Sequence, residues 1–198
     1  MNKKKLTKLI LKEFPTFSNS GDYIFVNPLE HILSGFLIEK TRRGIYIWRF
    51  IYPLFDCNEH LSLLYSDRLD VSKFYINSSE LSDKDISDKD ISDKVLNIIQ
   101  QNIYLAHECK TIADFCTELQ NKKGILEHKH AQMIYGFALI LNNKEELAKE
   151  YLLLSVSKLS EPFKSRCMEV LKMLDNDVDS AKQVILELED RMKQLLKI

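Results

Sequence analysis

The spacing of the apolar residues changes near residue 77, and this change constrains the fold more than any other feature of the 198-residue chain. Before that point aliphatic and aromatic residues alternate, as in the segment 45–52, which reads IYIWRFIY. Such alternation is typical of β-strands, whereas beyond residue 93 apolar residues recur every three or four positions, as in amphipathic helices. We therefore predict an α+β fold in three parts, namely a sheet region over 1–76, a low-complexity linker over 77–92 and an α-helical hairpin region over 93–198.

The residue pattern of the sheet region predicts one amphipathic helix followed by a small antiparallel four-stranded sheet. Apolar residues between Leu6 and Phe14 fall on one helical face, and Pro15 ends the pattern. Segments rich in aromatic and β-branched residues then alternate with turn signals. The connections are too short for helical crossovers, so we expect antiparallel strands. The expected strands are 23–26, 32–39, 45–52 and 61–65.

The third of these strands carries the single tryptophan of the chain, Trp48. Tyr46, Trp48 and Phe50 share one face of the strand, and a mostly aliphatic row occupies the other face. A central strand with both faces covered would place Trp48 in the core, which is our expectation, because large aromatic residues dominate cores. The alternative is that Trp48 anchors a partner, since Trp and Tyr are also enriched at interfaces.

Residues 81–94 read LSDKDISDKDISDK, in which a five-residue unit begins at Ser82, recurs at Ser87 and starts again at Ser92. A period of five matches neither a helix nor a strand. We predict a solvated segment whose last copy caps a helix that begins near Asp93. The segment lacks the glycine and the closing glutamate of a calcium-binding loop.

Beyond residue 93 the pattern is helical throughout. Thr111 and Asp114 have the spacing of a capping box at the start of one helix. A single offset aligns Ala148 with Ala181 and Leu152 with Ile185, so the last four helices contain an internal repeat. These four helices are expected at 129–141, 144–158, 162–174 and 178–197.

The repeat resembles the helical hairpins of tetratricopeptide proteins. Gly136, Ala148, Leu152 and Ser155 match the small and large packing positions of that family. The resemblance implies tetratricopeptide-like packing of each helix against the next. About two repeats are present, which favours hairpin packing over a long concave groove.

Charge and hydropathy exclude several classes of protein. The 28 Lys and Arg nearly balance the 29 Asp and Glu, so we expect no direct contact with nucleic acid, and Arg42-Arg43 is expected to be a solvated hairpin tip. No apolar stretch approaches the roughly 20 residues that span a bilayer. Lys8 and Lys12 interrupt the apolar N-terminal segment, which excludes a secretory signal there. We therefore expect a soluble cytoplasmic protein without membrane contact.

Two pairs of residues could in principle supply sulfur and nitrogen ligands for zinc, namely Cys57 with His60 and His107 with Cys109. Neither pair has the spacing of a zinc finger or of a helical HExxH motif. His128 and His130 lie at a helix start and are expected to be solvated. We therefore expect no metal and no cofactor.

Motifs of nucleophilic and phosphate chemistry are missing from the sequence. It contains no GxSxG, no Walker loop and no GxGxxG. The acids and histidines of the sheet region lack the convergent spacing that would assign them a catalytic role. We therefore predict a protein that is not an enzyme.

Several segments resemble a group of small bacterial immunity proteins that protect against polymorphic toxins or the toxins of contact-dependent inhibition. They are Gly35–Glu39, Ile45–Leu54, Asp67–Leu69, Thr111–Phe115 and Tyr135–Leu139. The resemblance implies a non-catalytic protein that binds a cognate protein toxin and occludes its active site or partner surface. The alternatives are a helical-repeat adaptor for a peptide or helix, and an enzyme of unrecognised type.

Acidic residues of the C-terminal part are the expected contacts with such a toxin. The sheet region over 1–76 carries 11 basic and 8 acidic side chains, and the remainder carries 17 basic and 21 acidic ones. A toxin that acts on nucleic acid has a basic active site, which an acidic surface would complement. The candidate protein-binding residues are Glu145, Glu146, Asp175, Asp177, Asp179, Glu187 and Asp190.

Overall fold

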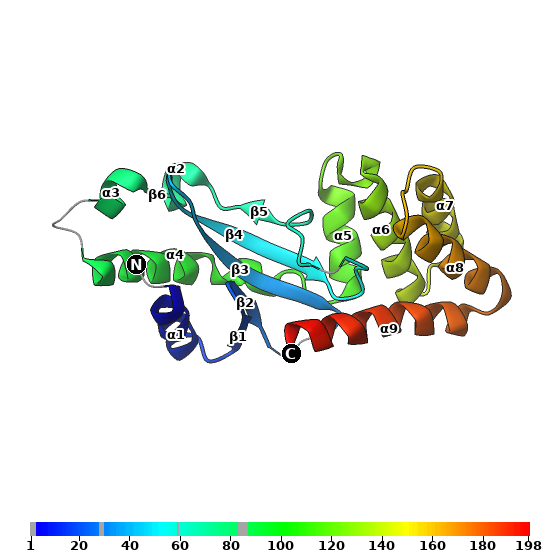
Figure 1. The fold of residues 1–198 in the computed structure, drawn as a ribbon, viewed down its shortest axis with the longest axis horizontal. Helices are drawn as coiled ribbons and strands as arrows, with labels where there is room; N and C mark the ends of the chain where they lie inside the picture. The colour runs from blue at the N-terminus through cyan, green and yellow to red at the C-terminus, as the bar shows by residue number, and fades with distance from the viewer. Residues whose placement is uncertain (1–2, 28–29, 59, 83–86) are drawn as a thin grey trace. The chain divides into compact units, whose positions relative to one another are not determined.

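The computed structural model describes residues 3–27, 30–58, 60–82 and 87–198 (Figure 1). The fold is α+β, as predicted, with an N-terminal helix, an antiparallel sheet and C-terminal helices. Two compact units divide the chain differently from the predicted parts. The first unit comprises Met1–Ile51 and Ser66–Cys109, and the second comprises Tyr52–Tyr65 and Lys110–Ile198.

The first unit is built around the sheet. Among the described residues the sheet has six strands, of which five follow the order β1-β2-β3-β4-β5 and the sixth, β6, also pairs with β4 (Figure 1). The pairs β1–β2, β2–β3, β4–β5 and β4–β6 are antiparallel. The elements are α1 (Lys3–Glu13), β1 (Phe17–Ser20), β2 (Tyr23–Val26), β3 (Ile32–Lys40), β4 (Gly44–Pro53), β5 (Asp67–Arg68), α2 (Val71–Phe74), β6 (Ile76–Asn77), α3 (Ser78–Ser82), α4 (Asp88–Asn102) and the 3-10 helix η1 (Ile103–His107).

Three of the four predicted strands are confirmed as β2, β3 and β4. The fourth predicted strand, 61–65, was wrong, because this segment forms no strand. It belongs to the second unit, and its Tyr65 is buried. The strand β1 was missed because its polar sequence FSNS resembles a turn. Gly21, at φ 58°, makes the tight turn that returns β1 onto β2.

The helices α1 and α4 supply the apolar cover of one sheet face. Leu6 and Ile10 of α1 share a buried core with Ile47 of β4 and with Val95 and Ile99 of α4. The opposite face carries Tyr46 and Trp48, which are only half-buried. The expectation that Trp48 is a core residue was therefore wrong, because the core shared with α1 and α4 forms on the aliphatic side of β4, and on the other face the side chains are fully buried only from Phe50 onward.

The helix α4 begins at Asp88, five residues before the predicted start near Asp93. Ser87 caps it in a reciprocal capping box with Asp90, so the second copy of the five-residue unit is the cap rather than the third. Ile91 lies one turn before the buried Val95, and its burial explains the longer helix. Part of the predicted linker is thus helical, and residues 83–86 lie outside the described residues.

The second unit is helical apart from the segment 52–65 (Figure 1). The predicted capping box of Thr111 and Asp114 is confirmed. In each of the last four helices, the first and the last residue lie within two positions of the predicted ones. The elements are α5 (Ile112–Asn121), the 3-10 helix η2 (Ile125–Glu127), α6 (Lys129–Leu141), α7 (Glu145–Val156), α8 (Phe163–Asn176) and α9 (Val178–Leu196).

Small residues allow α6 and α7 to approach closely, as the repeat predicted. A Cβ at Gly136 would lie 2.6 Å from a side-chain carbon of Leu152 and 3.4 Å from the carbonyl oxygen of Ala148. Ala148 and its repeat equivalent Ala181 are both fully buried. These contacts are those of tightly packed helical hairpins. In the part of the chain that the structure describes, no helix is long and apolar enough to span a bilayer.

Candidate functional site

A cavity of about 590 Å³ opens in the second unit. Three segments form it, namely the loop that follows β4, the N-terminal turns of α8 and the C-terminal half of α9. Its lining residues include Asp56, Cys57, Asn58, Phe163, Arg166 and Met192. Its volume falls within the range of small-ligand and peptide-anchor sites, which is roughly 300–1,000 Å³.

Most of the apolar lining of the cavity comes from one face of the helix α9. Leu188, Met192 and Leu195 recur at intervals of four and three residues, so they share one helical face. Phe163, in the first turn of α8, contributes an aromatic ring. Leu195 remains 54% exposed, which leaves an apolar side chain open to a partner at the cavity.

Two arginines supply positive charge. Arg166 Nη1 on α8 lies 2.6 Å from Glu169 Oε2, one turn further along the helix. Arg191 lies on α9 between Leu188 and Leu195 and is exposed. The cavity therefore combines apolar walls with charged side chains, which is the composition of binding sites that need both affinity and orientation.

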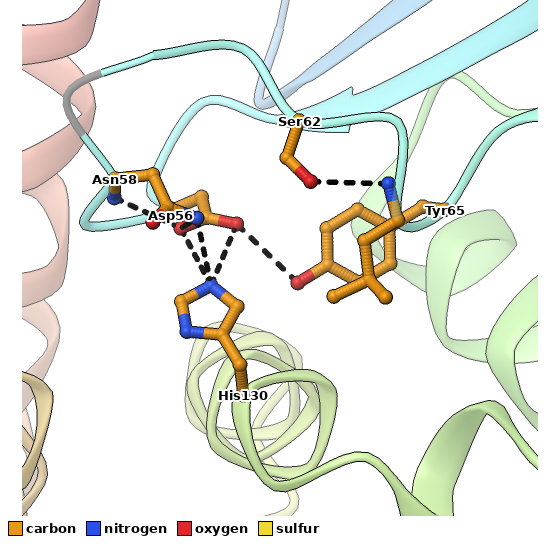
Figure 2. Close-up of polar contacts among 6 residues, drawn as sticks. Asp56, Asn58, Ser62, Tyr65 and His130 are labelled. Carbon is orange, nitrogen blue, oxygen red and sulfur yellow. Dashed lines mark hydrogen bonds and ion pairs between the residues drawn. The ribbon is translucent and has the colours of Figure 1, made fainter. Parts of the chain in front are cut away.

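Asp56, one of the residues that line the cavity, has a buried carboxylate that is held in a network of hydrogen bonds (Figure 2). Asp56 Oδ1 accepts hydrogen bonds from the backbone N–H of Asn58 at 3.0 Å and from Asn58 Nδ2 at 2.9 Å. Its Oδ2 accepts from the Tyr65 hydroxyl at 3.3 Å, and His130 Nε2 lies 2.9 Å from Oδ1. The Asp56 side chain is fully buried, and this set of donors compensates its charge.

The network determines where the proton of the His130 ring lies. Nε2 faces both oxygens of Asp56, at 2.9 and 3.1 Å, and must carry a hydrogen to donate to the carboxylate. The amide nitrogen of Asn58 also lies 3.0 Å from Nε2, but two donors do not bond each other. Asn58 Nδ2 and His130 Nε2 therefore both donate hydrogen bonds to the carboxylate of Asp56.

Burial, together with the same carboxylate, keeps two neighbouring weak acids protonated. Burial, and then the charge of Asp56, raise the pKa of Cys57 to about 12. The same two causes raise the pKa of Tyr65 well above its usual value. A thiol is an effective nucleophile only as the thiolate, so Cys57 is inert near neutral pH. Neither the cavity-lining Cys57 nor Tyr65 behind it in the network is thus activated as a nucleophile.

His130 was expected to be solvated, and this expectation was wrong. It is 8% exposed in the first turn of α6, where Asp56 offers a partner, and its ring packs edge-on to Phe163 with ring centroids 4.9 Å apart. His128 is exposed, as predicted. No local signal could have found the pair, because 74 residues separate His130 from Asp56.

The candidate zinc ligands belong to different units. Cys57 and His60 lie in the second unit, whereas His107 and Cys109 lie in the first. Among the residues that the structure describes, no group of three or more His, Cys, Asp or Glu side chains is placed to hold a metal ion.

None of the acidic residues singled out in the sequence lines the cavity. Five of them occupy the starts of α7 and α9 and the end of α8, which is the opposite end of the α8–α9 hairpin. Asp177 caps α9, and Asp175 pairs with Lys149 of α7, so both have structural partners. The other three at this end are Glu145, Glu146 and Asp179, while Glu187 and Asp190 are exposed further along α9.

Comparisons with known proteins add no family to this description. A scan against protein-family models finds no match, and searches of the curated proteins and of the solved structures find none either. The class that the coordinates define is an α+β chain with a helical-hairpin unit that contains a mixed apolar and charged cavity.

Proposed function

We propose that this chain is a non-catalytic binding protein that neutralises a cognate bacterial toxin by occluding its active site or partner surface. The observation that carries the proposal is the cavity of about 590 Å³ between the loop 56–58, α8 and α9. We assign this cavity, together with the exposed Leu195 beside it, as the contact site for a side chain or short segment of the toxin.

The composition of the cavity favours binding. Large apolar side chains such as Phe163 and Met192 give affinity by removing apolar surface from water. Arg166 and Arg191 are of the residue type most enriched at interface hot spots, together with Trp and Tyr. A partner side chain that enters the cavity would be buried on several sides, as hot-spot anchors are.

The state of the acid–base groups supports an inhibitor over an enzyme. The thiol of Cys57 has a pKa of about 12. A nucleophilic cysteine needs a lowered pKa, so Cys57 is not poised for covalent catalysis. An inhibitor needs no such group, because complementary surface is sufficient.

The identity of the partner as a toxin rests on the resemblance of the sheet and helix segments to immunity proteins. The acidic residues at the far end of the α8–α9 hairpin, such as Glu146 and Asp179, could add electrostatic steering toward a basic toxin. The cavity is uncharged overall if Asp56, Arg166, Glu169 and Arg191 are ionised, so it would contribute mainly apolar affinity.

A helical-repeat adaptor is the second candidate function. It is favoured by the close packing of Gly136 against Leu152, which is typical of tetratricopeptide-like hairpins. An adaptor would bind a peptide without affecting any toxin, so protection of cells from the toxin distinguishes the two functions.

The experiment compares two leucines that are equally exposed in the same unit. Leu195 lines the cavity and Leu154 of α7 does not, and each is 54% exposed. The purified chain is titrated calorimetrically with the toxin encoded by the neighbouring gene. We expect Leu195→Glu to weaken binding at least about tenfold and Leu154→Glu to leave it unchanged, because a charge in an apolar contact is costly. Equal effects of the two variants would reject the cavity as the contact site.

A further inference from the structure

A cluster of aromatic and charged side chains lies on the sheet of the first unit, outside the cavity. We call it the aromatic–arginine cluster and define it by Tyr46 and Trp48 of β4, Arg68 of β5, Glu39 of β3, and Tyr75. Trp48 was expected either in the core or at a partner surface, and its half-buried position on the sheet is compatible with the second.

The guanidinium of Arg68 is held from several directions. Its central carbon lies 4.4 Å from the ring centroid of Tyr46 and 4.6 Å from that of Trp48. Glu39 Oε2 lies 3.2 Å from Arg68 Nη2 and accepts a hydrogen bond from Trp48 Nε1 at 3.0 Å. Cation–π contacts and a shared carboxylate therefore fix the arginine and the indole together.

Tyr75 extends the cluster toward the hairpin between β3 and β4. Its ring centroid lies 4.7 Å from that of Tyr46, and its hydroxyl donates to the carbonyl oxygen of Arg43. Arg42 and Arg43 are both exposed at this hairpin. The rings and the basic hairpin thus form one continuous surface.

The strand register places the cluster on the sheet face away from the core of this unit. Trp48 and Arg68 are register partners, so their side chains share a face. The next pair, Arg49 and Asp67, points to the opposite face, where Ile47 packs into the core. The face of the cluster stays open enough to leave 44% of the Arg68 side chain and 35% of the Glu39 side chain exposed.

We propose that the aromatic–arginine cluster is an interaction surface for an acidic polypeptide segment. A carboxylate of the partner pairs with the exposed part of the Arg68 guanidinium, and an apolar side chain of the partner packs on the rings of Tyr46 and Trp48. Arg, Trp and Tyr are the residue types most enriched at interface hot spots.

The charges in and around the cluster select an acidic partner. Glu39 is already engaged by both Arg68 and Trp48, whereas Arg42 and Arg43 add positive charge beside the rings. The first unit as a whole carries 14 basic and 13 acidic side chains, so the positive charge is local to the hairpin beside the rings. Opposite charge on the partner would steer the encounter and fix its register.

The cluster is also organised before the partner arrives. Arg68 is a long side chain that would lose conformational freedom on binding, but its contacts with two rings and a carboxylate have already restricted it. Binding to a pre-organised group costs less entropy. This surface lies in a different unit from the cavity, and the inference does not depend on the toxin proposal.

The experiment uses Trp48 as its own reporter, because the full chain contains no other tryptophan. Synthetic peptides rich in glutamate and leucine are titrated into the protein while Trp48 fluorescence is recorded. The same peptides with lysine in place of glutamate, and a single-stranded oligonucleotide, are titrated in parallel. We expect a saturable change in emission with the acidic peptides alone, which weakens as salt is raised.

Matched variants assign the response to the cluster. Arg68→Gln removes the charge, and Lys73→Gln removes a surface cation on α2 whose side chain is 69% exposed. We expect the first to weaken acidic-peptide binding at least about tenfold and the second to leave it unchanged. Thermal melting shows that both variants fold.

Three results would overturn the proposal. One is the lack of any fluorescence response to the acidic peptides, and another is an equal response in Arg68→Gln. The third is a response to the oligonucleotide without one to the acidic peptides, which would assign the surface to nucleic acid instead.

Discussion

Nε2 of His130 lies 2.9 Å from Oδ1 of Asp56, although 74 residues separate the two along the chain. The pair connects the loop after β4 to the first turn of α6 and holds one wall of the cavity in place. Tyr65 and Asn58 donate to the same carboxylate, so three side chains depend on one buried charge. The shape of the candidate binding site therefore depends on this network.

Removal of the carboxylate should destabilise the fold strongly. Asp56→Ala leaves the donors of His130, Tyr65 and Asn58 without their acceptor inside the protein. We expect the free energy of unfolding in urea to fall by about 3–5 kcal/mol, as for a broken buried pair. Glu187→Ala, at an exposed position of α9, should change it by less than about 0.5 kcal/mol. A loss below about 1 kcal/mol for Asp56→Ala would show that the network is not structural.

The raised pKa of Cys57 predicts slow alkylation. Because burial and Asp56 raise this pKa to about 12, almost no thiolate is present near neutral pH. Iodoacetamide should therefore modify Cys57 in the native chain far more slowly than in the urea-unfolded chain at the same pH, as followed by peptide mass spectrometry. Equal rates in the two states would contradict the burial of this thiol.

Asp177 predicts a pH dependence of stability. It accepts hydrogen bonds from the Ser180 hydroxyl at 2.5 Å and from the backbone N–H of Asp179 at 3.1 Å, which lower its pKa below 3.8. Because the pKa of this carboxyl is lower in the folded than in the unfolded chain, its ionisation stabilises the fold at pH values above the unfolded-state pKa. This contribution disappears as the pH falls through the folded-state pKa.

Melting temperatures of Asp177→Asn and of the unmodified chain test this dependence. The difference between them should be constant at neutral pH and shrink below about pH 4. Asp179→Asn, two residues further along α9, controls for the loss of a surface charge. A difference for Asp177→Asn that grows as the pH falls would have the wrong sign.

The repeat predicts that a larger side chain at Ala148 is not tolerated. Ala148 is fully buried, and its carbonyl oxygen would lie 3.4 Å from a Cβ at Gly136. Ala148→Leu should lower the free energy of unfolding by about 1–3 kcal/mol through overpacking. Glu150→Leu, on the exposed side of the same helix, is the control. Equal stability of the two variants would mean that the helices do not pack closely at this position.

The elements that follow from local patterns could be predicted from the sequence. The helices α6 to α9 have one-sided or all-round apolar stripes, and β2, β3 and β4 have dense aromatic and β-branched residues. The early start of α4 was missed because the five-residue repeat hid the spacing of Ile91 from Val95. β1 was missed because pairing with β2, rather than its own composition, makes it a strand.

The candidate sites depend on contacts between distant residues, which local patterns do not encode. Asp56 follows a strand and His130 starts a helix, and neither has a motif that indicates the other. Trp48 was expected in the core because large aromatic residues dominate cores, but the sequence does not say which face of β4 the helices α1 and α4 cover. The stacking of Arg68 on Trp48 follows only from the register of β5 on β4.

The central claim is that this chain neutralises a toxin by binding and not by chemistry. The most direct measurement is a titration of the activity of the toxin encoded by the neighbouring gene against increasing amounts of the purified chain. We predict that inhibition rises linearly and is complete at one chain per toxin molecule, with the toxin recovered intact after separation. Complete inhibition by substoichiometric amounts of the chain, or recovery of a covalently altered toxin, would contradict the claim.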